Sequence, residues 1–152
     1  MLNKKIIFLI LFMVLVLIPF TFAEDNVNST NYVLSDSSDN SYPNIYFDSS
    51  VSQDNGNGSI DNPYKYLTSN RIKENSNIYL ADGEYVLDSS KSISKYNSFN
   101  GESSENTVII FKNSGNAFSN SGLLKFNDLT LKGVHIYNTG KLISDNVIFR
   151  DS

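Results

Sequence analysis

The last third of the chain is a series of short apolar stretches separated by turns rich in asparagine, aspartate and glycine. Each stretch is three to five residues long, which is too short to close a hydrophobic core alone. We expect them to be strands that stack as rungs, each burying the apolar face of its neighbour. They are Thr107–Phe111, Leu123–Phe126, Leu129–Leu131, Val134–Ile136 and Val147–Phe149. The pattern predicts an all-β fold built by repetition.

Alternation within these strands predicts which side chains face the core. Leu129 and Leu131 are expected to point inward and Thr130 outward, because side chains alternate along a strand. Val147 follows Leu129 by 18 residues, and Leu129 follows Val108 by 21, which is close to one turn of a parallel β-solenoid. Stacked turns would let asparagine and aspartate side chains at the corners hydrogen-bond between rungs.

The N-terminus has the pattern of a secretory signal peptide. Lys4 and Lys5 precede the apolar run Ile6–Ile18, and small residues lead to a cleavage site after Ala23. The apolar run is shorter than the roughly 20 residues that span a bilayer, so cleavage is expected rather than a retained anchor. Residues 1–23 therefore predict a secreted or cell-surface protein that meets the membrane only through its signal peptide.

The composition of the mature chain excludes several classes of protein. Removing residues 1–23 leaves 10 basic and 16 acidic side chains, a net charge of −6, which disfavours nucleic-acid binding. The chain has no cysteine and one histidine, so neither a disulfide framework nor a structural zinc site is expected. We expect no cofactor and no metal.

The mature chain divides into a polar leader and a folded part. Residues 24–44 are mostly asparagine, serine and aspartate and are predicted to be disordered. The folded part is expected over 45–152, with early strands at about 44–48, 77–81 and 84–87, and weaker candidates around Ile93 and Phe99.

A helix is predicted between the first two strands. Asn62 suits the N-cap and Pro63 the first helical position, and Leu67 and Ile72 extend an apolar stripe. We therefore expect a short helix over 63–72 that caps the first rung.

Four segments of the folded part resemble a known family. They are Ile45–Ser52, Asn55–Ser59, Asn62–Leu67 and Ile78–Tyr85. In this order they resemble the entry region of pectate-lyase-like right-handed parallel β-helix proteins, most closely the archaeal adhesin-like surface proteins. The resemblance extends over 45–150. It implies an all-β, right-handed parallel β-helix with a short N-terminal capping helix. A β-sandwich is the rival fold for short strands of this kind.

The resemblance implies a non-catalytic surface protein whose polar sheet face contacts extracellular carbohydrate or another cell. One alternative is the N-terminal portion of a polysaccharide lyase or hydrolase. Another is a structural component of the cell envelope that associates end to end. Family members are usually longer, so we expect Ser152 to be an internal point of a larger gene product.

Charged residues of the last strands are the candidates for lyase chemistry, which uses calcium ligands and a basic residue. They are Asp128, Asp145, Asp151, Lys132, Lys141 and Arg150. Asp128 and Asp145 lie at expected corners, where short acidic residues are common without any catalytic role. We therefore assign no catalytic residue and no metal ligand among them.

Three other features can be interpreted either as structural or as functional. The oxygen-rich loop Asp54–Asp61 lacks the spacing of a calcium-binding EF-hand and is predicted to be a cap loop. His135 is expected to be an exposed bystander on a strand. The sequons at Asn28 and Asn57 are candidate N-glycosylation sites.

Tyrosines near the expected cap offer a further choice. Their rings suit stacking on sugars, but we expect them to pack beneath the cap instead. They are Tyr64, Tyr66, Tyr79 and Tyr85.

Overall fold

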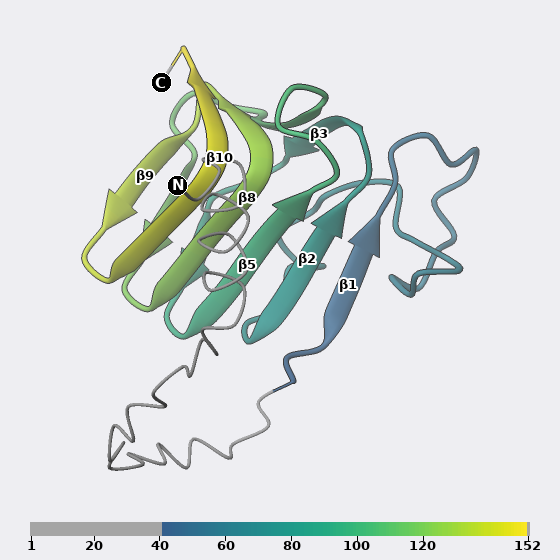
Figure 1. Cartoon of the computed structure of the whole chain (residues 1–152), viewed down its shortest axis with the longest axis horizontal. Coiled ribbons are helices and arrows are strands. Elements are labelled where there is room, and N and C mark those ends of the chain that lie inside the picture. Colours follow the sequence, from purple (N-terminus) through teal and green to yellow (C-terminus); the bar gives the residue numbers. More distant parts are fainter. Residues whose placement is uncertain (1–40, 152) are drawn as a thin grey trace, which may run out of the picture. The chain divides into compact units, whose positions relative to one another are not determined.

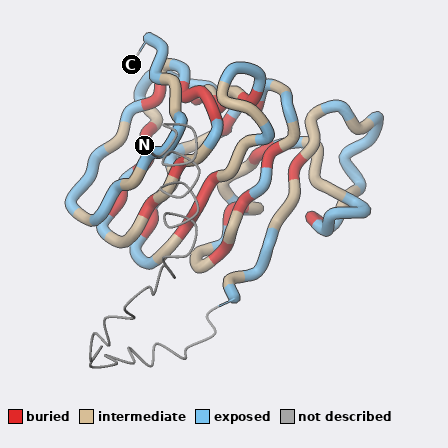
Figure 2. Tube along the Cα trace, in the orientation of Figure 1, coloured by how far each residue is buried: buried red, intermediate tan, exposed pale blue. Residues whose placement is uncertain are grey.

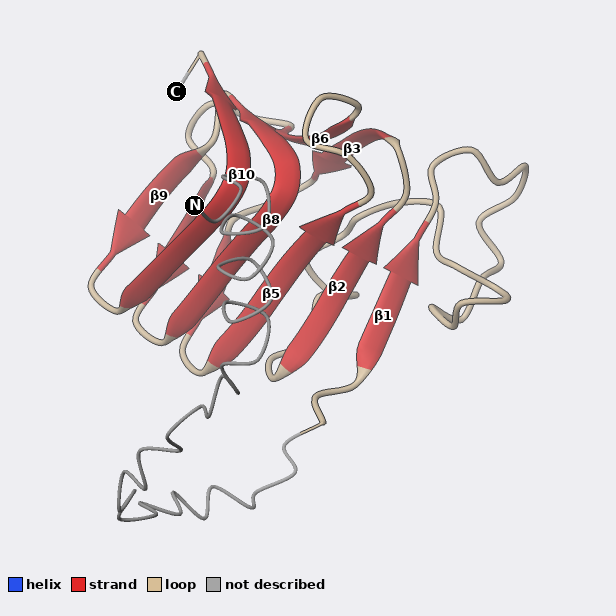
Figure 3. Cartoon of the chain, viewed as in Figure 1, coloured by secondary structure: helices blue, strands red, loops and turns tan. Residues whose placement is uncertain are grey.

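A computed structural model describes residues 41–151 as an all-β protein, and no helix occurs within that range (Figure 3). Ten strands follow one another along the chain. They are β1 (Asn44–Phe47), β2 (Ser76–Leu80), β3 (Gly83–Leu87), β4 (Lys91–Ile93), β5 (Tyr96–Gly101), β6 (Thr107–Phe111), β7 (Ala117–Asn120), β8 (Leu123–Lys132), β9 (His135–Asn138) and β10 (Lys141–Arg150). The expected all-β class is confirmed.

Every pairing between these named strands is parallel. The larger sheet has the order β1-β2-β5-β8-β6-β3, with β10 also paired to β8, and a smaller sheet has the order β4-β7-β9. In Figure 1 the strands β1, β2, β5, β8 and β10 lie side by side, and the sheet curls over toward β6 and β3. An antiparallel sandwich is thereby excluded for these strands.

The long strand β8 joins the two parts of the curled sheet. Its first half pairs with β5 and its second half with β6, and the change occurs at Asp128. Asp128 has a positive φ of 53°, and Asn146, one rung later in β10, has a φ of 50°. The two predicted strands at 123–126 and 129–131 are therefore one bent strand.

The expected register is right at one step and wrong at another. Val147 pairs with Leu129, as the 18-residue spacing predicts. Val108 pairs with Thr130 rather than with Leu129, so Ile109 is the residue that shares a row with Leu131. The expected spacing from Val108 to its partner is one residue shorter than the observed one. A shift of one residue in the register exchanges the two faces of a strand.

The core lies between the inner face of the curled sheet and the smaller sheet. Phe99 and Phe126 are neighbours in the register, and their ring centroids are 5.3 Å apart. Phe118 of β7 packs against both from the opposite side, at 5.3 and 5.4 Å. All three side chains are fully buried, and Figure 2 shows buried stretches on several strands of the curled sheet. Burial of each ring contributes about 1.5–3 kcal/mol.

Inward residues of β10 are less covered than those of β8. Leu142 and Phe149 are 36% and 52% exposed, whereas their register partners Leu124 and Leu131 are fully buried. The strand β8 has paired strands on both sides, β5 or β6 on one and β10 on the other, whereas β10 pairs only with β8.

The predicted helix over 63–72 is wrong, because this segment pairs with β1 instead. Tyr64 N–H donates to the carbonyl oxygen of Tyr46 at 3.0 Å, and Asp48 N–H donates to that of Tyr64 at 2.9 Å. Leu67 and Ile72 are nonetheless buried in the core, as the apolar stripe predicts. The segment therefore covers the outer edge of β1 as an irregular loop, which protects an edge that would otherwise recruit further strands.

Two expectations for the N-terminus lie outside the described residues. These are the signal peptide at 1–23 and nearly all of the polar leader, up to residue 40. Within 41–151 no helical segment has the length and apolarity needed to cross a membrane. The first strand begins at Asn44, as expected.

Candidate functional site

The outer face of the curled sheet carries a row of aromatic and amide side chains. Inward residues such as Ile78 and Phe99 alternate with them along each strand. Because the strands are parallel and in register, equivalent outward residues stand next to one another. In order across β1, β2, β5, β8 and β10, the row is Tyr46, Tyr79, Asn100, Asn127 and Asp145.

A stacked tyrosine pair begins this row. The rings of Tyr46 and Tyr79 have centroids 5.2 Å apart and planes inclined by 17°. Tyr79 remains 37% exposed, so part of its side chain is accessible to a ligand. Next in the row, Asn127 Nδ2 donates to Asn100 Oδ1 at 2.8 Å, which fixes the orientation of both amides. The row thus combines an apolar platform with oriented polar groups.

A second aromatic pair lies nearer the beginnings of the same strands. Tyr42 and Tyr96 stack with their centroids 4.1 Å apart. The Tyr96 hydroxyl donates to Asn77 Oδ1 at 2.7 Å, and the ammonium group of Lys125 lies 5.7 Å from the Tyr96 ring centroid. Burial raises the pKa of Tyr96, so its hydroxyl stays protonated and keeps donating. The aromatic surface therefore continues along the strands.

The ends of β1, β2 and β5 form the floor of a cleft of about 430 Å³. Tyr46, Tyr79 and Asn100 line it from the sheet, and Ile60 and Pro63 line it from the loop that follows β1. Such a mixture of an apolar wall and a few polar groups is typical of small-ligand sites.

Two carboxylates also line this cleft, and both are held in place. Asp48 Oδ1 accepts hydrogen bonds from the backbone N–H and the hydroxyl of Ser50, at 2.9 and 2.6 Å. Glu102 Oε2 accepts one from the N–H of Asp82 at 3.0 Å. Among the described residues no lysine or arginine lines the cleft. The cleft is therefore electronegative.

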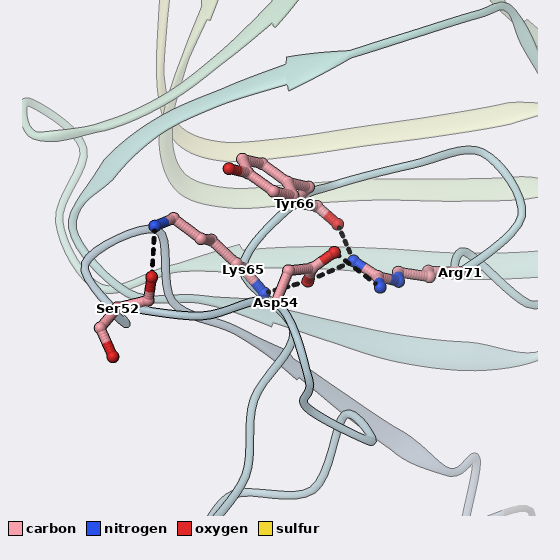
Figure 4. A network of polar contacts seen from close by, with 5 residues as sticks. All are labelled: Ser52, Asp54, Lys65, Tyr66 and Arg71. Atoms are coloured by element: carbon pink, nitrogen blue, oxygen red, sulfur yellow. Dashed lines mark hydrogen bonds and ion pairs between the residues drawn. The ribbon is translucent and has the colours of Figure 1, made fainter.

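The loop that supplies one wall is braced by an ion pair (Figure 4). The two terminal guanidinium nitrogens of Arg71 donate to Asp54, at 2.8 and 3.0 Å, and the Lys65 N–H donates to the same carboxylate at 3.2 Å. The hydrogen bonds from Arg71 lower the pKa of Asp54. Arg71 also lies 4.3 Å from the ring centroid of Tyr64. These contacts connect the two ends of the segment that contains Ile60 and Pro63.

Of the two candidate glycosylation sites, one lies within the residues that the structure describes. Asn57 is exposed on the loop, where its Oδ1 accepts a hydrogen bond from the N–H of Ser59 at 3.0 Å. Asn28 lies outside the described residues. Occupancy of either sequon stays a prediction.

The charged residues considered for lyase chemistry are dispersed. Asp128 forms the bend of β8, and Asp145 pairs in register with Asn127 on the outer face, so its expected place at a corner is wrong. Lys132 and Arg150 are register neighbours near the far ends of β8 and β10. Within 41–151 no three acidic or histidine side chains converge as metal ligands would.

His135 is exposed, as expected for its strand position, but the prediction for the tyrosines is only partly right. Tyr85 is buried and Tyr64 is half-buried against the core. Tyr66 and Tyr79 are exposed, and Tyr79 belongs to the outer row.

Sequence reasoning did not find Tyr46, Asn100 or Glu102 as site residues. The alternation of side chains could have indicated that Tyr46 faces outward, since it is flanked by two inward apolar residues. What the sequence did not provide was the register that brings these residues together.

Comparison with known proteins gives no relative. The chain matches no protein-family model, and it has no significant match among curated proteins or solved structures. The functional inference therefore rests on the outer face and its cleft.

Proposed function

We propose that this protein is a secreted or cell-surface protein of the adhesin-like type that binds carbohydrate without catalysing a reaction on it. Its parallel strands would form a right-handed β-helix of the pectate-lyase-like superfamily, and the outer face of β1, β2, β5 and β8 would be the contact surface. The parallel pairing supports this proposal, as does the resemblance of residues 45–150 to archaeal adhesin-like chains.

The observation that carries the proposal is the stacked pair of Tyr46 and Tyr79 at the cleft, next to the fixed amide of Asn100. The C–H face of a sugar ring packs on an aromatic ring, and its hydroxyl groups need oriented hydrogen-bonding partners. An aromatic surface and oriented hydrogen-bonding groups are both present within this one row. Because the row extends across several strands, it suits an extended polymer.

The test compares binding of the purified protein, the Tyr79→Ala variant and the Tyr137→Ala variant to an array of glycans and wall polysaccharides. Tyr137 is also a strongly exposed tyrosine on a strand, but it lies on β9 of the smaller sheet. We expect Tyr79→Ala to weaken glycan binding by at least tenfold and Tyr137→Ala to leave it unchanged. Urea unfolding of each variant shows that the fold is retained.

Either of two results would overturn the proposal. One is that the folded protein binds no glycan on the array. The other is that Tyr79→Ala and Tyr137→Ala have equal effects, which would place the contact away from the outer row. Release of unsaturated products from polygalacturonate in the presence of calcium would instead indicate the lyase alternative.

A further inference from the structure

We propose that the cleft at the ends of β1, β2 and β5 selects amino sugars that carry a free ammonium group. This inference rests on the proposed carbohydrate-binding function and names the class of sugar that the cleft would take. It is carried by the combination of a stacked tyrosine pair with two fixed carboxylates in one cavity.

The aromatic platform favours a cation as well as a sugar face. A tyrosine ring has a negative face, which attracts an ammonium group within about 6 Å of its centroid. Tyr46 and Tyr79 lie in the floor of the cleft with their rings nearly parallel. The binding of a sugar ring that carries an ammonium group would therefore be favoured both by packing on the tyrosines and by the electrostatic attraction to them.

The rim of the cleft adds negative charge on two sides. Asp48 follows the last residue of β1 and Glu102 follows the last residue of β5, so they flank the end of β2. Within 41–151 each uses one carboxylate oxygen for its structural hydrogen bonds, to Ser50 and Asp82 respectively. The second oxygen of each carboxylate remains to accept a hydrogen bond from a ligand.

The same charges oppose acidic sugars. Two cationic groups of the outer face and the loop are used elsewhere, since Lys125 lies over Tyr96 and Arg71 pairs with Asp54. A uronate in the cleft would face two carboxylates with no cation among the residues that line it. N-acetylation of an amino sugar removes the ammonium charge and leaves only the packing and hydrogen-bonding contributions.

The test measures calorimetric affinities for three trisaccharides: glucosamine, N-acetylglucosamine and galacturonic acid oligomers of equal length. We expect the glucosamine trimer to bind at least fivefold more tightly than the acetylated trimer, and the galacturonate trimer to bind most weakly. Since Glu102→Gln keeps an oxygen that can accept from Asp82, we expect this variant to fold normally and to lose the preference for the free amine. Glu84→Gln, at an exposed carboxylate on β3 outside the cleft, should keep it.

The outcomes separate this inference from the function on which it rests. Equal affinities for the two amino sugars, with no effect of Glu102→Gln, would overturn the selectivity but leave carbohydrate binding intact. Tighter binding of the galacturonate trimer would overturn it as well. If no trimer and no longer glycan bound, the proposed function itself would fail.

Discussion

Asn146 donates a hydrogen bond of 2.8 Å from its Nδ2 to Oδ1 of Asp128, and both residues have left-handed backbone conformations. They occupy equivalent positions on adjacent strands, at the point where β8 and β10 bend. Gly101 of β5 lies beside this corner, because it follows Asn100, the register partner of Asn127, and a Cβ added to it would meet the carbonyl oxygen of Asp128. These residues thus form a stacked corner, in which each rung turns over the previous one.

Asp128 is expected to tolerate asparagine but not alanine. Asparagine adopts left-handed conformations readily and retains an acceptor oxygen, whereas alanine loses the hydrogen bond and costs about 1–2 kcal/mol in this backbone region. Urea unfolding should show Asp128→Asn close to the wild type and Asp128→Ala less stable by about 1–2 kcal/mol. Equal stability of the two variants would mean that the corner does not depend on this conformation.

Gly101→Ala is expected to destabilise the fold. A Cβ at this position would collide with the carbonyl oxygen of Asp128 and lie 3.0 Å from the Cβ atoms of Leu129 and Thr107. Overpacking of this kind typically costs about 1–3 kcal/mol. Gly115→Ala is the matched control, because nothing lies within 4 Å of its added Cβ. Thermal or urea unfolding that ranks the two variants equally would contradict the packing at the corner.

Tyr85 should make stability fall between about pH 10 and 12. Its hydroxyl donates to the carbonyl oxygens of Phe47 and Ala81, and burial raises the pKa of Tyr85 to about 12, above its ordinary value of 10. The folded state therefore holds this proton more tightly than the unfolded state. The contribution is fully present below pH 10 and is lost as the pH rises toward 12, by up to about 3 kcal/mol.

The measurement is urea unfolding at several pH values for the wild type and Tyr85→Phe. We expect Tyr85→Phe to be less stable at pH 8, because two carbonyl groups lose a donor, and to have a flatter profile above pH 10. Parallel profiles for the two proteins would show that Tyr85 does not titrate in this way.

Arg71→Lys is expected to loosen the wall of the cleft. Lysine retains the charge but cannot donate to both oxygens of Asp54 in a planar arrangement or stack on Tyr64 in the same way. Hydrogen exchange at the Tyr64 N–H should accelerate, and proteolysis within 52–62 should become faster. Lys112→Arg, at an exposed residue outside this network, should change neither. Unaltered exchange in Arg71→Lys would show that the ion pair does not brace the loop.

The alternation of side chains located several strands closely from the sequence. β1, β2, β3 and β6 lie within one residue of their predicted bounds. β5 and β7 were harder to recognise because their inward rows include the buried polar residues Asn97 and Asn120. The Asn97 side chain donates to the carbonyl oxygen of Lys73 at 2.6 Å, and that of Asn120 donates to the carbonyl oxygen of Lys141 at 3.0 Å. Polarity in such strands reflects hydrogen bonding between rungs, which a hydrophobic pattern does not reveal.

The helix prediction failed for a related reason. The sequence at Asn62 and Pro63 suits a helix start, but the N–H and carbonyl groups of Tyr64 satisfy the free edge of β1 instead. Local capping preference was weaker than a tertiary hydrogen-bonding demand. The outer row could not be predicted from the sequence either, because its members are separated by unequal numbers of residues. The separations are 33, 21 and 27 residues from Tyr46 through Tyr79 and Asn100 to Asn127. Loops of unequal length between the strands hide the regular spacing of these side chains in the sheet.

The outward row has a consequence for how recognition can change over time. Its members are spaced by the backbone ladder, about 4.8 Å from strand to strand, and none of them contributes to the aromatic core on the other side of the sheet. For the carbohydrate binding that we propose, a single exchange at Tyr79 or Asn100 would alter one step of the contact with a polymer and leave the remaining steps in place. Preference for a new glycan could therefore be acquired one rung at a time, on a scaffold that does not have to be rebuilt.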